Sequence, residues 1–170
     1  KNEIMNATKL VEVEDLYRPF KEKKKTKATE AIKNGLEPLA KEIMAFPFKG
    51  NLDEMASKYI NENVPNFEKA IEGAKYIIAE NISDDAKIRK SIRDNTYNYG
   101  IIKSKIKKNA KDENKVYDMY YDYQEKVKFI KPHRILALNR GENEDVLSVS
   151  IENDKERTIE YINKRVIKND

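Results

Sequence analysis

The chain has 170 residues, with 34 lysines and arginines against 30 aspartates and glutamates, a net charge of +4 and a mean hydropathy of −0.86. It has no cysteine, which excludes disulfides, thiol catalysis and cysteine-based zinc sites. A chain of this length buries roughly 70% of the surface that its unfolded form exposes. Because its apolar residues, 39% of the total, recur at helical spacing, we expect a folded, highly charged helical protein.

Helical spacing of apolar residues runs through the first hundred residues of the chain. The predicted helices cover about residues 8–17, 28–33, 36–44, 51–60, 66–82 and 83–99. Thr8 is the expected N-cap of the first helix, and Arg18-Pro19 should end it, because the residue before a proline is pushed out of the helical region. Gly73 lies inside a long predicted helix, where glycine costs about 1 kcal/mol relative to alanine, so a close helix contact is expected there.

The later part of the chain has less regular patterns. Residues 101–108 are expected to be extended or a loop, and residues 112–123 are interpreted as a helix with an aromatic face. A further helix is predicted to begin at Pro132 and to end at Gly141. Alternation of apolar and polar residues across 145–152 predicts the clearest strand in the chain.

These patterns predict a mainly α fold with one small β element near the C-terminal end, at residues 146–151. Residues 1–141 are expected to form a multi-helix domain with a basic loop at residues 21–27. Residues 142–170 are expected to add the strand and a terminal helix or second strand, packed on the same domain. No internal repeat of fixed period is visible.

The inventory of reactive residues offers little chemistry. The nearest pair of glycines is fifteen positions apart, so neither of the glycine-rich phosphate-binding motifs can be written. His133 is the only histidine, which excludes a zinc site with two histidine ligands. A role for His133 as a lone base or in a Ser-His-Asp arrangement stays open beside a capping or packing role next to Pro132. No catalytic, cofactor or metal site is expected.

The location of the protein can also be predicted from what the sequence lacks. No apolar run approaches the roughly 18 residues that a membrane span needs, and no signal peptide is present. The chain begins with Lys1 in the middle of a pattern, as a piece of a longer protein would. We therefore expect a cytoplasmic protein fragment with no membrane partner.

Lysine is concentrated in two segments. The candidate contacts to nucleic acid are Arg18, Lys21, Lys23, Lys24, Lys25 and Lys27 in the first segment and Lys103, Lys105, Lys107 and Lys108 in the second. Cations near phosphates release counterions and give affinity that does not depend on sequence. Lysine lacks the fork of arginine and suits backbone contact better than base readout. The alternative is a solvated face; a shared nucleic-acid surface requires the two segments to converge.

Several stretches of the chain together resemble the bacterial Tex transcription-accessory proteins. In that family a helix ending in L-E-D-L-Y-x-P-Y/F-K leads to a basic T-R/K-A stretch and then to G-L-E-P-L-A, as in LYRPFKEKKKTKATEAIKNGLEPLA. The likeness continues through GAKYIIAE and PHRILALNRGENEDVLSVSI. Two departures concern the basic segment, where Glu22 stands in place of the family's proline and lysines at Lys24 and Lys25 replace arginines.

The resemblance implies an N-terminal helical segment of a multidomain protein that binds nucleic acid mainly through an S1 domain outside this chain. The expected function is a non-catalytic module that gives scaffold and auxiliary electrostatic contacts to RNA or DNA within the transcription machinery. The alternative is a protein-interaction scaffold for RNA polymerase or ribosomal partners without nucleic-acid contact. That alternative predicts an exposed apolar patch, for example around Phe46 and Phe48.

Overall fold

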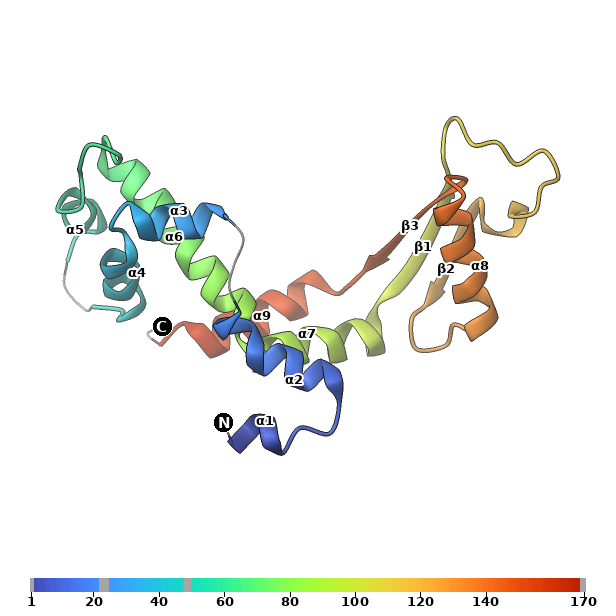
Figure 1. Cartoon of the computed structure of the whole chain (residues 1–170), viewed down its shortest axis with the longest axis horizontal. Helices are drawn as coiled ribbons and strands as arrows, with labels where there is room; N and C mark the ends of the chain where they lie inside the picture. Colours follow the sequence, from blue (N-terminus) through green and yellow to red (C-terminus); the bar gives the residue numbers. More distant parts are fainter. Residues whose placement is uncertain (1, 22–24, 48–49, 169–170) are drawn as a thin grey trace. The chain divides into compact units, whose positions relative to one another are not determined.

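The computed structural model describes residues 2–21, 25–47 and 50–168, and Figure 1 shows the path of the chain. The chain divides into two compact units. Unit 1 is Lys1–Lys90 with Lys164–Asp170, and unit 2 is Ser91–Asn163. The predicted fold class is confirmed, since the chain is mainly helical with a small sheet near its C-terminal end. The domain boundary after residue 141 stays a prediction.

Unit 1 is built from helices. Its elements are α1 (Asn2–Met5), α2 (Leu10–Tyr17), the 3-10 turn η1 (Arg18–Phe20), α3 (Lys27–Lys33), α4 (Glu37–Met44), α5 (Leu52–Ser57), α6 (Phe67–Asp84) and the start of α7 (Ala86–Tyr99). The predicted end of α2 at Arg18-Pro19 is confirmed. The predicted N-cap is wrong, because Lys9 takes that position and Thr8 instead donates its N–H to the Glu12 carboxylate at 3.3 Å.

The core of unit 1 forms where α3, α4 and α5 pack on α6. Its buried apolar residues are Ala28, Ala31, Leu36, Leu39, Ala40, Ala56, Val64, Ala70, Ala74 and Ile77. The close contact predicted at Gly73 is confirmed, because a Cβ there would lie 2.3 Å from Cδ1 of Leu36. Helix α6 can therefore carry the smaller helices on one side and still present a polar face elsewhere.

Unit 2 contains the sheet. Its elements are the rest of α7, β1 (Ile101–Ile106), the 3-10 turn η2 (Asp118–Tyr120), β2 (Asp122–Lys126), α8 (Pro132–Asn143), β3 (Leu147–Glu152) and most of α9 (Lys155–Val166). All pairing is antiparallel in the order β2-β1-β3, so β1 is central. The strand predicted at residues 146–151 is confirmed as β3, and the terminal segment is a helix.

The helix predicted for residues 112–123 is wrong. The Asp112 carboxylate accepts the backbone N–H groups of Val116 and Tyr117, each at 2.9 Å, and holds a turn that leads through η2 into β2. Tyr117 and Tyr120 are buried in the core of this unit. Aromatic spacing that fits one helix face also fits a turn followed by a strand, and here side-chain capping and pairing with β1 decide.

One face of the sheet is covered and the other is open. Leu138 of α8 packs with Ile102, Val149 and Tyr123 on the covered face. The open face carries the polar residues Lys103, Lys105, Asp122, Gln124, Ser148 and Ser150, which the register places opposite one another. This alternation is the normal pattern of an antiparallel sheet with one solvated face.

The predicted end of α8 at Gly141 is wrong, because the helix continues to Asn143. Gly141 is buried, and a Cβ there would lie 2.6 Å from Cδ1 of Leu147 and 3.1 Å from Cδ1 of Tyr117. The glycine is therefore needed for the close approach of α8 to the sheet.

The Gly141→Ala variant should be less stable than the natural chain. Overpacking of a closed site costs about 1–3 kcal/mol, which outweighs the gain of about 1 kcal/mol in helix propensity. Urea denaturation measures the difference, with Asn139→Ala at an exposed position of the same helix as the control. Equal or greater stability of the Gly141→Ala protein would contradict the packing role.

Candidate nucleic-acid interface

The first basic segment, residues 21–27, begins at a corner that is held on α6. The Nε of Arg18 lies 2.9 Å from Oδ1 of Asp84. The side chain of Asp84 is only 9% exposed, whereas that of Arg18 is 49% exposed. Pro19 fixes the backbone of η1 directly after this contact. The ion pair therefore determines where the basic segment leaves the helical core.

The other end of the basic segment is also held on α6. The hydroxyl of Thr26 donates to Oε1 of Glu80 at 3.0 Å, and Thr26 is the N-cap of α3. The ammonium of Lys27 donates to the hydroxyl of Tyr76 at 3.2 Å and lies 4.8 Å from the centre of its ring. A cation over an aromatic face is attracted by the ring quadrupole.

The α6 residues that hold the segment form one stripe. Glu72, Tyr76, Glu80 and Asp84 are spaced four residues apart, which places them on the same face of a helix. The Tyr76 hydroxyl donates to Oε1 of Glu72 at 3.0 Å and links two members of the stripe. Sequence reasoning missed this set, although the spacing E-x3-Y-x3-E-x3-D was the signal that could have revealed it.

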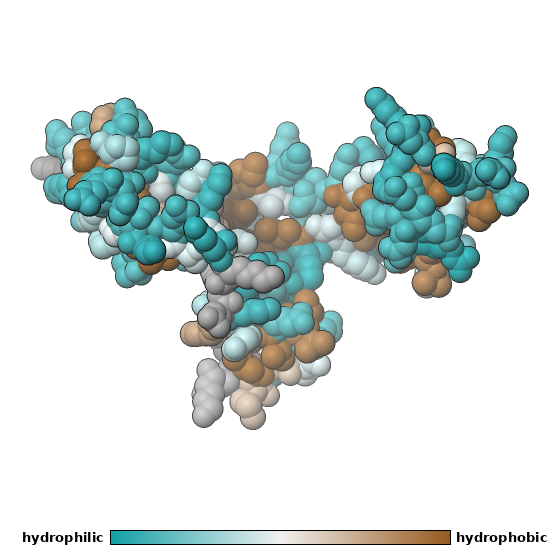
Figure 2. Space-filling view, turned by 45° about the horizontal axis from the view of Figure 1, so that its top comes forward, coloured by the Kyte–Doolittle hydropathy of each residue, from teal (hydrophilic) through white to brown (hydrophobic). Residues whose placement is uncertain are grey.

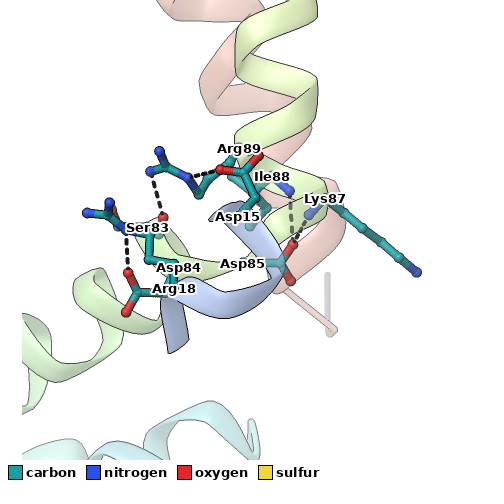
Figure 3. Close-up of polar contacts among 8 residues, drawn as sticks. All are labelled: Asp15, Arg18, Ser83, Asp84, Asp85, Lys87, Ile88 and Arg89. Atoms are coloured by element: carbon teal, nitrogen blue, oxygen red, sulfur yellow. Dashed lines mark hydrogen bonds and ion pairs between the residues drawn. The ribbon is translucent and has the colours of Figure 1, made fainter. Parts of the chain in front are cut away.

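A second ion pair holds α2 against the start of α7. The Nε of Arg89 lies 2.6 Å from Oδ1 of Asp15, whose side chain is 6% exposed. Arg89 also donates from Nη1 to the carbonyl of Ser83 at 3.4 Å. Figure 3 shows Asp15 and Arg18 on the ribbon of α2 and η1, facing the residues around the junction of α6 and α7.

Asp85 separates α6 from α7. Its Oδ1 accepts the N–H groups of Lys87 at 2.8 Å and Ile88 at 2.9 Å (Figure 3). Its Oδ2 lies 3.2 Å from Nη2 of Arg165. Burial works against ionisation of this carboxyl, but the hydrogen bonds from Ile88, Arg165 and Lys87 outweigh it and lower the pKa of Asp85. The ionised carboxylate thus caps α7 at its positive end.

The lysines of the first segment have different environments. Lys21 and Lys25 are exposed, and within the described residues no carboxylate lies at ion-pair distance from either. Lys27 is engaged with Tyr76. Lys23 and Lys24 lie outside the described residues. Among the described residues of the segment, the ammonium groups available to a ligand are therefore those of Lys21 and Lys25.

The second basic segment belongs to unit 2, so its convergence with the first stays a prediction. Lys103 pairs with Glu152 at 2.6 Å, and Lys107 pairs with Asp145. Lys105 and Lys108 are exposed. Lys103 and Lys105 line a hollow of about 410 Å³ on the open face of the sheet, whose walls also include Ser148 and Ser150.

No catalytic constellation is visible in residues 2–21, 25–47 and 50–168. His133 is exposed in the first turn of α8, and in this part of the chain no carboxylate lies within hydrogen-bond distance of it. The same residues contain no group of three or more potential metal ligands. None of the helices they form is long and apolar enough to cross a membrane.

Removing Asp15 or Arg89 should reveal a strong coupling between the two side chains. A double-mutant cycle with Asp15→Ala and Arg89→Ala should give a coupling energy of about 1.5–3 kcal/mol, which is typical of a hydrogen bond to a charged group. The exposed pair Glu37 and Lys41, 2.8 Å apart on α4, is the control and should give about 0.2–0.5 kcal/mol. Denaturation of the single and double variants measures both values. Equal coupling in the two cycles would show that α2 is not held by this contact.

The Asp85 carboxylate should make stability depend on acid pH. A lowered folded pKa means that its contribution is complete above the ordinary aspartate value of about 3.9 and is lost as the pH falls through the lowered value. Asp85→Asn keeps a capping oxygen but removes the charge. The free energy of unfolding of the natural chain should therefore fall more steeply below about pH 4 than that of the variant. Parallel curves would contradict this.

The chain is similar to a family of known proteins. The family model described as Tex central region-like matches residues 49–169. The chain is 51% identical over 172 residues to YdcI of Bacillus subtilis, covering 99% of this chain and 24% of that protein. It is 35% identical over 139 residues to the transcriptional accessory protein Tex of Neisseria gonorrhoeae, covering 82% of this chain and 18% of that protein.

A more distant relative is human S1 RNA-binding domain-containing protein 1, 31% identical over 159 residues, which cover 87% of this chain and 16% of that protein. The chain thus spans about a quarter or less of the length of these relatives. The matched range includes α6, α7 and the whole sheet of unit 2. The resemblance inferred from the sequence is confirmed, and the chain belongs to the Tex family.

Proposed function

We propose that this chain is a non-catalytic helical module of a cytoplasmic, Tex-type transcription accessory protein. It acts as a scaffold and adds a weak electrostatic contact to the phosphate backbone of RNA or DNA. Relatives named for transcription and for an S1 RNA-binding domain support this proposal. Most of the nucleic-acid affinity of the whole protein is assigned to parts of it beyond this chain.

The observation that carries the nucleic-acid contact is the anchored basic segment, in whose described part Lys21 and Lys25 have no carboxylate at ion-pair distance. Lys21 and Lys25 are exposed between two attachments to α6, made by Arg18 at one end and Thr26 at the other. Attachment at both ends reduces the conformational freedom that the segment loses on binding. The lysines can then neutralise phosphates and release counterions.

The contact is weak because of the helix beneath it. The α6 stripe contains the carboxylates Glu72, Glu80 and Asp84, and the last two contact Thr26 and Arg18 at the two ends of the basic segment. Their negative charge reduces the positive potential that a nucleic acid meets at Lys21 and Lys25. Such a segment suits orientation of a strand that is bound elsewhere, because phosphate contacts position a nucleic acid without reading its sequence.

A protein-interaction scaffold remains the second candidate. Leu10 and Phe20, at the two ends of the α2–η1 region, are each 76% exposed, and Tyr17 between them is exposed as well. Figure 2 shows hydrophobic areas on a surface that is otherwise mainly hydrophilic. The patch predicted around Phe46 and Phe48 stays a prediction, since Phe46 is half-buried and Phe48 lies outside the described residues.

Fluorescence anisotropy with single-stranded RNA and duplex DNA across a salt series tests the nucleic-acid contact. The test variant replaces Lys21, Lys23, Lys24 and Lys25 by alanine. The natural chain should bind most tightly at about 50 mM salt, and the log–log slope should fall by about 0.7–0.9 for each phosphate contact that the variant loses.

A charge-matched control replaces the exposed residues Lys9, Lys58, Lys128 and Lys168 by alanine. This control removes the same net charge from positions outside the basic segment. It should change the slope much less than the test variant does. Equal slopes in the two variants, or no binding of the natural chain at about 50 mM salt, would refute the contact and favour the scaffold.

A further inference from the structure

Strand β3 forms an edge of the sheet in unit 2. It pairs with β1 on one side, and within the described residues no strand pairs with its other side (Figure 1). Edge strands leave N–H and C=O groups free and are usually protected by proline or by charged side chains. Strand β2, at the opposite edge, has the charged sequence DYQEK, whereas β3 reads LSVSIE, without lysine or proline.

The hydrogen-bond pattern shows which groups of β3 are free. The N–H of Lys107 donates to the carbonyl of Val146 at 2.9 Å, immediately before β3 begins. In an antiparallel pair, alternate residues bond to the partner strand, so the even-numbered residues of β3 bond to β1. The N–H and C=O groups of Val149 and Ile151 therefore point to the free edge.

Burial decreases along this edge. Leu147 is fully buried, Val149 is half-buried and Ile151 is 57% exposed. In the part of the chain that the structure describes, the backbones of Val149 and Ile151 have no hydrogen bond outside the sheet. The second half of β3 can therefore accept another strand.

The side chains along β3 define what an added strand should carry. On the covered face its neighbours are Val149 and Ile151, which favour apolar partners. On the open face its neighbours are Ser148, Ser150 and, at the end of the strand, Glu152; beyond the two serines lie Lys105 and Lys103 of β1. Two strand spacings of about 4.8 Å separate the added strand from those lysines.

A long acidic side chain on the added strand can extend across that separation, because the serines between are short. Ser148 and Ser150 are short and leave the hollow of about 410 Å³ that Lys103 and Lys105 line. A glutamate on the added strand could extend over a serine toward the ammonium group behind it. Asp122 and Glu152 also line this hollow, and Glu152 pairs with Lys103. Lys105, opposite Ser148, has no ion-pair partner among the described residues, so it is the ammonium group that a glutamate of the added strand would complement.

We propose that the edge of β3 binds an extended peptide of a partner protein whose apolar and acidic residues alternate, by addition of the peptide as a fourth strand. This interaction goes beyond the nucleic-acid contact proposed above and uses other residues. Nucleic acid is not the expected occupant, because backbone phosphates do not offer the alternating donors and acceptors of a strand. A second copy is not expected either, because β3 itself places serines where acidic residues are needed.

Amide hydrogen exchange followed by NMR on the whole chain tests the proposal. The probe is a capped peptide of alternating valine and glutamate, with a glutamine-for-glutamate peptide as its control. The acidic peptide should slow the exchange of the amides of Val149 and Ile151. The amide of Gln124 should not change, although it points to the free edge of β2, because the N–H of Ile106 bonds to Tyr121 one residue before that strand.

Proline variants test the backbone contact directly. Ile151→Pro removes a free N–H without removing a bond to β1, and proline is tolerated at such edge positions. We expect binding about tenfold weaker, as loss of a hydrogen bond and a steric block would give. Ile151→Ala, which keeps the N–H but loses apolar contact area, should weaken binding less than Ile151→Pro does. Gln124→Pro, at the other edge, should bind as the natural chain does.

Replacement of Lys103 and Lys105 by alanine tests the charge argument without changing the edge. It should abolish the preference for the glutamate peptide over the glutamine peptide. Equal protection of Gln124, unchanged binding by Ile151→Pro, or no preference between the peptides in the natural chain would overturn the proposal. Protection that rises with protein concentration alone would identify a second copy as the occupant and overturn it as well.

The result of the peptide-binding experiment can be distinguished from that of the nucleic-acid experiment. The variant that lacks Lys21, Lys23, Lys24 and Lys25 should keep full peptide binding, because none of these residues lies in unit 2. Loss of peptide binding in that variant would count against the edge of β3 as the site. Protection of the Val149 and Ile151 amides by RNA would do the same.

Discussion

The junction of α6 and α7 depends on carboxylates that are almost fully buried. Asp15 and Asp84 are 6% and 9% exposed, and each accepts a hydrogen bond from an arginine of another element. A buried charge without such a partner would cost several kcal/mol, so the two arginines fix the position of α2 and η1. Because the basic segment follows η1, the same two contacts determine where this segment begins.

Within unit 1, apolar packing holds the smaller helices on α6, and polar contacts hold the ends of the basic segment on the same helix. The small residues of α3 and the leucines around α4 pack on one side of α6, where Gly73 admits Leu36. The stripe from Glu72 to Asp84 contacts the two ends of the basic segment with carboxylates and a tyrosine. A single long helix thus supports the core of the unit and also anchors its most cationic segment.

Local signals in the sequence predicted most helices and the strand β3, because caps, prolines and alternation act over a few residues. The segment 112–123 could not be assigned in this way, since its tyrosines fit a helix face equally well and pairing with β1 decides. The same holds for Arg18, whose partner Asp84 is 66 residues away. Composition identified the lysine segments, but only the structure separates Lys27, which contacts Tyr76, from the exposed Lys21 and Lys25.

The attachment of the basic segment at both ends has a consequence for substitutions within it. From Arg18 to Lys27 an extended chain reaches roughly 30 Å, whereas their partners Asp84 and Tyr76 are about 12 Å apart along the helix. The number of residues between the two attachments is therefore larger than the distance between their partners requires, so substitutions there need not move α2 or α3. Exchange of the lysines in this segment should therefore change its charge and leave the helices of unit 1 in place.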